Sequence, residues 1–169
     1  MHPTAERFAE AANERHGVDV DVHEFEAGTK TAAAAAEAIG CDVAQIASSL
    51  VFLADGDPVV VVTSGANRVS EGRLVDAVSA GDGPTVDGSS PGAADVEMAG
   101  PDDVKAATGW SIGGVPPICH ETDVPVLFDE TLLDHATVWA AAGTPETVWP
   151  VDPATLVDLA GARVADVAD

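Results

Sequence analysis

The chain has 169 residues, 46% of them hydrophobic, and its 29 acidic and seven basic residues give a formal net charge of −22. This length and composition predict one globular domain over residues 1–169 and exclude an intrinsically disordered chain. No apolar run approaches the roughly 20 residues of a membrane span, and the N-terminus lacks a signal-peptide pattern. We therefore expect a cytoplasmic protein with no membrane partner.

The acidic residues are spread through every segment, which excludes an acidic interaction tail because such a tail is a block of like charge. Lysine is scarce, with only Lys30 and Lys105 in the chain. Evenly spread acidity is typical of proteins from a high-salt cytoplasm, where the Debye length falls to about 3 Å at 1 M salt. We expect a halophilic protein; an acidic protein from an ordinary cytoplasm is the alternative.

The first half of the chain combines helical and β-rich patterns. Apolar residues recur at helical spacing near the N-terminus until Gly17 interrupts them, and Asp42 is placed to cap a short helical turn. Asp55-Gly56-Asp57 lies between two β-rich runs and is a strong hairpin signal. In chain order we predict a helix at 3–16, a strand at 18–25, a helix at 31–40, a helical turn at 43–48, strands at 49–54 and 58–64, and a helix at 70–81.

The second half begins with a turn-rich surface segment at 81–94, with a short strand about Val86 as an option. After it we predict a helix at 100–109, strands at 124–130, 136–143 and 147–151, a helix at 152–160, and a strand at 163–168. The chain shows no strict βαβ repeat and no boundary for a second domain. The predicted fold class is a mixed α/β or α+β domain with a central, partly antiparallel sheet flanked by helices.

The stretch TGWSIGGVPPICH, residues 108–120, suggests three interpretations: a metal site, a tight turn or a ligand contact. A metal site on Cys119 and His120 is disfavoured because adjacent side chains of a strand point in opposite directions, and no further ligand lies at zinc-site spacing. Gly113 and Gly114 leave the backbone open to a close approach, and the two following prolines make it rigid. The residues alone do not decide between the tight turn and the ligand contact.

A second loop, SGANRVSEGR, follows the apolar strand at 58–64 and leads into the predicted helix at 70–81. It has too few glycines for a P-loop or a dinucleotide-binding motif. Asn67 and Arg68 lie in it, and an arginine between a strand and a helix is a candidate contact for a phosphate or a carboxylate. An ordinary surface arginine is the equal alternative.

Several blocks of the sequence, in order, resemble the YbaK/ProX family, the editing domains associated with prolyl-tRNA synthetase. The blocks are TKTAAAAAEAIGCDVAQIASSLVF, PVVVVTSGANRVS, VKAATGWSIGGVPPI, VLFDE and VWAAAGTPETVWPVDPATLVDLAGARVADVA. The family's Gly-x-x-x-Pro signature is matched by Gly113 to Pro117. The resemblance implies the family's single α/β domain with a mixed, curved sheet.

The resemblance also implies a hydrolase that cleaves, in trans, the ester between a small wrong amino acid and the 3′-terminal ribose of tRNA. No metal or cofactor is expected, since water attacks the carbonyl and backbone amides hold the oxyanion. By this resemblance Gly113 and Gly114 are the oxyanion donors, and Asp129 is a family acid near the pocket. The expected substrate-binding residues are Thr31, Ser48, Asn67, Arg68, Ile112, Val115, Pro116 and Pro117. Thr31 has helix capping as its simpler interpretation.

One position departs from the family pattern: Ser48 stands where members usually have a lysine that contacts substrate. Lysine depletion in a high-salt proteome explains the change with activity retained. The alternative is a module that binds a tRNA 3′ end or an aminoacyl derivative without cleaving it. The expected partners are aminoacyl-tRNA, through its 3′ end, and an aminoacyl-tRNA synthetase.

Overall fold

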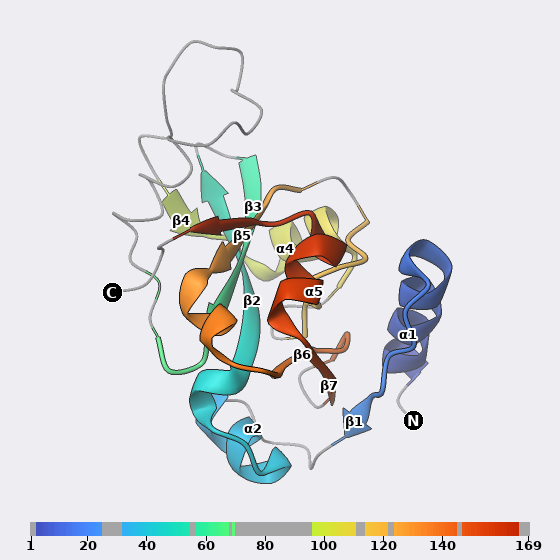
Figure 1. The fold of residues 1–169 in the computed structure, drawn as a ribbon. Coiled ribbons are helices and arrows are strands. Elements are labelled where there is room, and N and C mark those ends of the chain that lie inside the picture. The colour runs from blue at the N-terminus through green and yellow to red at the C-terminus, as the bar shows by residue number, and fades with distance from the viewer. Residues whose placement is uncertain are drawn as a thin grey trace.

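A computed structural model of the chain describes residues 3–24, 32–54, 57–67, 69, 96–110, 114–121, 124–144 and 147–165. Figure 1 shows its strands crossing the middle of the molecule, with α1 on the right of the view and α2 at the bottom. None of the helices in these ranges has the length and apolar character needed to cross a membrane.

The helices begin and end at residues suited to those places. Asp152 caps α5, with Oδ1 accepting from the backbone N–H groups of Ala154 and Thr155, and Gly161 ends it in a left-handed conformation. Gly109 ends α4 in the same way. The helices of the described ranges are α1 (Pro3–His16), α2 (Ala32–Ile39), α4 (Pro101–Thr108) and α5 (Pro153–Ala160), with 3-10 turns η1 (Val43–Gln45) and η2 (Glu130–Asp134).

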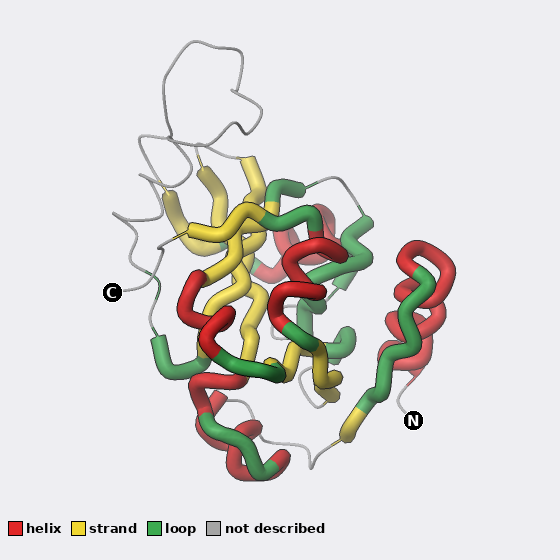
Figure 2. The backbone as a smooth tube through the Cα atoms, in the orientation of Figure 1, coloured by secondary structure: helices red, strands yellow, loops and turns green. Residues whose placement is uncertain are grey.

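The strands form one mixed sheet, seen as the yellow segments of Figure 2. They are β1 (His23–Glu24), β2 (Ile46–Ala54), β3 (Asp57–Ser64), β4 (Val96–Met98), β5 (Val126–Asp129), β6 (Val138–Ala141), β7 (Thr147–Val151) and β8 (Arg163–Ala165). Their order is β1-β7-β6-β2-β3-β5-β8, and β4 pairs with the end of β2. The pairs β3·β5, β5·β8 and β2·β6 are parallel, whereas the others are antiparallel.

The core lies on both faces of the central strands. In β3, Val60 and Val62 belong to the larger cluster, which includes Phe8 of α1, while Val59 and Val61 belong to a smaller cluster on the other face. This alternation follows from the period of two along a strand. The central position of β3 between β2 and β5 explains why this strand carries valine side chains on both of its faces.

The expected fold class is confirmed: a mixed, partly antiparallel sheet is flanked by helices. The helix at 3–16 has the predicted bounds, and β2 and β3 form the predicted hairpin. The helical turn predicted at 43–48 is wrong beyond Gln45, because Ile46 and Ala47 pair with β6 and begin β2. Of the strand predicted at 18–25, residues 18–22 form no strand and His23 and Glu24 pair with β7, while residue 25 lies outside the described residues. The sequence analysis missed β4 and η2, and its predictions for 70–94 lie outside the described residues.

Candidate functional site

A buried carboxylate lies at the end of β5 and gathers hydrogen bonds from three segments. Asp129 is 1% exposed. Its Oδ2 accepts from Thr63 Oγ1 at 3.2 Å, from the Ser64 backbone N–H at 3.2 Å and from Asn67 Nδ2 at 3.0 Å. Its Oδ1 accepts from the backbone N–H and the hydroxyl of Thr131, at 3.0 and 2.8 Å. We call these five residues the Asp129 cluster.

These hydrogen bonds set the charge state of Asp129. Burial raises the pKa of its carboxyl, but hydrogen bonds from Asn67, Thr131 and Ser64 outweigh burial and hold the pKa below its ordinary value of 3.8. The group is therefore a carboxylate at neutral pH. Because both oxygens already accept from the protein, Asp129 is better suited to holding neighbouring groups in place than to taking a proton from water.

Strand pairing brings the cluster together. The parallel register of β3 and β5 sets Val62 opposite Phe128, so that the carboxyl ends of the two strands lie side by side. Asp129 then caps η2 by accepting from the Thr131 backbone, which is typical of an aspartate before a helical turn. The sequence analysis missed Thr63, Ser64 and Thr131. The signal for Thr131 was the Asp-x-Thr spacing after an apolar strand.

Asn67 has a defined amide orientation within this cluster. Its Nδ2 donates to Asp129 and, at 2.8 Å, to Thr131 Oγ1, whose own hydrogen is donated to Asp129. A flipped amide would direct its oxygen at the carboxylate, so the carbonyl oxygen must point away from it. The half-buried Asn67 thus presents an acceptor on the side away from Asp129.

Ser48 is beside the cluster, on the neighbouring strand. It is opposite Thr63 in the antiparallel register of β2 and β3, and both residues are on the face of the smaller core cluster. Ser49 points to the other face, where its buried Oγ has no hydrogen-bond partner among the described residues. The structure therefore brings together three of the predicted site residues: Ser48, Asn67 and Asp129.

The other predicted group, Gly114 to Pro117, is buried and fits closely against the β6–β7 connection. A Cβ added to Gly114 would lie 2.6 Å from both the Cα and the carbonyl carbon of Thr144. Gly114 does not have a positive φ, so close packing is what excludes a side chain there. Val115 is 2% exposed and belongs to the larger core cluster.

Hydrogen bonds close the base of this loop, which we define as residues 109–121. The Glu121 N–H donates to the carbonyl of Thr108 at 3.0 Å, and Trp110 Nε1 donates to the carbonyl of Cys119 at 3.0 Å. His120 Nε2 donates to the carbonyl of Pro116 at 2.8 Å. Burial lowers the pKa of His120, although this hydrogen bond opposes the shift, so the ring is neutral at pH 7.

Cys119 is buried in the core with a left-handed backbone, at φ 64°. Burial raises the pKa of its thiol to about 11, despite the opposing charge of Arg15. A thiol this weakly acidic makes a poor nucleophile at neutral pH. Within the described ranges, no three His, Cys, Asp or Glu side chains converge as metal ligands.

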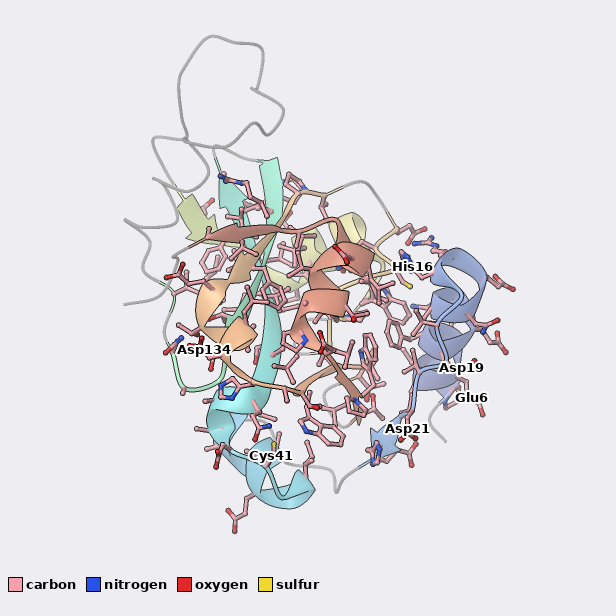
Figure 3. The ribbon with its side chains drawn as sticks, in the orientation of Figure 1. Glu6, His16, Asp19, Asp21, Cys41 and Asp134 are labelled. Atoms are coloured by element: carbon pink, nitrogen blue, oxygen red, sulfur yellow. The ribbon has the colours of Figure 1, made fainter. Side chains whose placement is uncertain are left out.

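Four predicted site residues, Thr31, Arg68, Ile112 and Gly113, lie outside the described residues. A hollow of about 340 Å³ lies away from both groups above, between α1 and residues 18–20. Glu10, Glu14 and Asp19 line it, and Figure 3 shows Asp19 beside α1. This acidic lining is unsuited to an anionic nucleic acid.

Comparison with known proteins gives consistent results. Residues 26–159 match the family model described as the aminoacyl-tRNA editing domain. The uncharacterized protein YwhH of Bacillus subtilis (strain 168) is 31% identical over 146 residues, which cover 85% of this chain and 83% of that protein. A solved structure described as a proposed trans-editing enzyme for prolyl-tRNA synthetase is 37% identical, with a TM-score of 0.87, covering 100% of this chain and 99% of the other. A structure from a study of epitope grafting onto scaffold proteins is 36% identical, with the same TM-score and coverage.

Proposed function

The chain belongs to the family of aminoacyl-tRNA editing domains (YbaK/ProX), and we propose that it is a trans-editing deacylase for tRNA carrying a small wrong amino acid. The observation that carries this proposal is the full-length likeness to the structure described as a proposed trans-editing enzyme for prolyl-tRNA synthetase. The likeness extends over nearly the whole of both chains.

The reaction we propose is hydrolysis of the aminoacyl ester. Water oxygen bonds to the carbonyl carbon, the bond from that carbon to the ribose oxygen breaks, and the ribose oxygen takes up a proton. Backbone N–H groups of Gly113, Gly114 and Val115 are the proposed donors to the oxyanion. The prolines at 116 and 117 and the packing of Gly114 on Thr144 support this role, because a rigid loop needs little reorganisation during the reaction.

We assign the Asp129 cluster to holding the substrate. Asp129 fixes Asn67, and the outward carbonyl oxygen of Asn67 is suited to accept from a substrate ammonium or hydroxyl group. Ser48 adds a hydroxyl on the neighbouring strand. Arg68, Thr31 and Ile112 remain candidates for further contacts. Such a reaction takes place in the cytoplasm, where tRNA is charged, with an aminoacyl-tRNA synthetase as a natural partner.

A non-catalytic binding module is the second candidate. It is favoured by Ser48, which replaces the lysine that the family usually carries. It is also favoured by Asp129, because both of its carboxylate oxygens already accept hydrogen bonds from the protein and are therefore poorly suited to take a proton from water. In that case the same surfaces bind the 3′ end of tRNA or an aminoacyl derivative and release it unchanged.

A deacylation panel separates the two candidates. Purified protein is incubated in molar KCl with tRNA charged with alanine, cysteine or serine, and with correctly charged prolyl-tRNA as the control. We expect release of at least one small amino acid well above buffer hydrolysis, with prolyl-tRNA spared. Saturable binding of the charged tRNAs without any release would instead establish the binding module.

A further inference from the structure

Two arginines of α1 hold opposite ends of the loop 109–121. Arg7 donates from Nη2 to the carbonyl of Gly109 at 3.1 Å, and Arg15 donates from Nη1 to the carbonyl of His120 at 2.9 Å. The two arginines are about two helical turns apart and so lie on the same side of α1. A single rigid helix therefore spans both ends of the loop.

The contact at Trp110 strengthens the attachment of α1 to the loop. The Arg7 guanidinium lies over the Trp110 ring, 4.3 Å from its centroid, and Phe8 meets the same ring edge-on with centroids 5.9 Å apart. Phe8 is fully buried and also packs on Trp149 of β7. Helix α1 is thereby anchored in the core while its arginines reach the loop.

These contacts use scarce groups. The chain has only seven lysines and arginines, and two of them serve these backbone carbonyls. Helix α1 also lies wholly outside residues 26–159, the part that matches the editing-domain model, whereas the loop lies inside it. A segment outside the matched residues thus contacts both ends of a loop that lies within them.

We propose that Arg7 and Arg15 are positioning residues for editing: they hold residues 114–121 of the loop so that the backbone N–H groups of Gly114 and Val115 can receive the aminoacyl carbonyl. This inference rests on the proposed deacylase function. Catalysis by backbone donors is sensitive to their placement, since a displacement of about 1 Å can cost on the order of 100-fold in rate. Among the described residues, the hydrogen bonds and the ring contact of these two arginines all go to the loop, so their effect should pass through it.

The first test measures the loop without using activity. Arg7→Met and Arg15→Met keep much of each apolar stem and remove the donor and the charge. Lys105→Met is the control, because it removes the same charge from an exposed side chain of α4. Hydrogen exchange followed by mass spectrometry should show the amides of 114–121 exchanging roughly tenfold faster in the arginine variants and unchanged in the control. Equal exchange in all three variants would overturn the proposal.

The second test measures deacylation by the same variants, compared only where their circular dichroism spectra and their midpoints of urea unfolding are equal. We expect kcat to fall about tenfold for each arginine variant with little change in KM, and Arg15→Lys to restore much of the loss because it retains a charged donor. A loss of kcat equal to that of Lys105→Met would contradict the proposal. If the unmodified protein shows no deacylation while the loop loosens in the arginine variants, the arginines support the loop but the deacylase function is refuted, and their role in editing is refuted with it.

Discussion

The backbone of Gly114 lies directly on the backbone of Thr144, in the connection between β6 and β7. A Cβ at Gly114 would be 2.8 Å from the Thr144 nitrogen and 2.6 Å from its Cα, distances that real Cβ atoms essentially never show. Both neighbours are main chain, which cannot turn aside as a long side chain can. The close contact therefore fixes where the loop 109–121 crosses the end of β6.

We predict that Gly114→Ala destabilises the fold by about 1–3 kcal/mol, as overpacking of a core does, and lowers deacylation as well. The measurement is urea unfolding alongside turnover. Gly100→Ala is the matched control, since the nearest atom to its added Cβ is Asp103 Oδ2 at 3.9 Å, and it should cost less than 1 kcal/mol. Loss of turnover at unchanged stability would show that the methyl group meets substrate rather than Thr144.

Asp129 should make folding stability depend on pH in the acid range. Its pKa is lowered in the folded state, so its contribution is fully present above the ordinary value of 3.8 and is lost as the pH falls through the lower folded value. We expect Asp129→Asn to cost about 2–3 kcal/mol at pH 7, because an amide cannot accept all five hydrogen bonds. Urea unfolding from pH 7 downward should show the difference from the natural protein shrinking below about pH 4. A constant difference would contradict the assignment.

Ser48→Lys should raise deacylation several-fold at low salt and change it little in molar KCl. A lysine at 48 would place a charged side chain beside Thr63 and the Asp129 cluster, where it can attract the phosphate or ribose of the tRNA end. High salt screens that attraction. Ser48→Met is the control, with comparable length and no charge. A large gain from lysine at every salt concentration would mean that the natural protein is a degenerate enzyme, which favours the binding module.

The two cysteines should differ in reactivity. With a pKa of about 11, only about 0.1% of Cys119 is thiolate at pH 8, and it is buried, whereas Cys41 is partly exposed. We expect a disulfide reagent to modify Cys41 first and Cys119 only after unfolding, and we expect Cys119→Ala to retain deacylation. Abolition of activity by Cys119→Ala, with the protein folded, would instead indicate that the thiol takes part in the reaction.

The charge of −22 should make editing increase with salt. Transfer RNA is a polyanion, and seven basic residues offer little benefit from counterion release, so low salt leaves mainly repulsion. We predict activity that increases severalfold from about 0.1 M to about 2 M KCl, measured with one charged tRNA and with circular dichroism at each step. An activity maximum at low salt, in protein that is folded there, would count against both this prediction and the halophilic interpretation.

Local patterns predicted much of the fold. The helix at 3–16 and the hairpin between β2 and β3 follow from apolar spacing and turn residues in adjacent sequence. The start of β2 was mispredicted because Ile46 and Ala47 are held by pairing with β6, some ninety residues later in the chain. Local propensity yields to such pairing.

The candidate site was predictable in part. Asn67 and Asp129 stood out as polar residues after apolar strands, but their hydrogen bond depends on the register of β3 with β5, which no local pattern encodes. Gly114 was singled out for its bare backbone, whereas the contact that requires it comes from Thr144. The arginines of α1 gave no signal, because their acceptors are carbonyl groups about a hundred residues away.

The long-range contacts of α1 have a consequence for the order in which the molecule assembles. Helix α1 donates to Gly109, 102 residues away, and β1 pairs with β7 beyond it. On a ribosome, α1 emerges before Gly109 and must wait until 102 further residues have been added before that partner exists. Contacts of such sequence separation form late because the entropy of closing the intervening chain must be overcome first. Helix α1 is therefore synthesised well before the loop 109–121 but docks late, and the loop gains its final support only then.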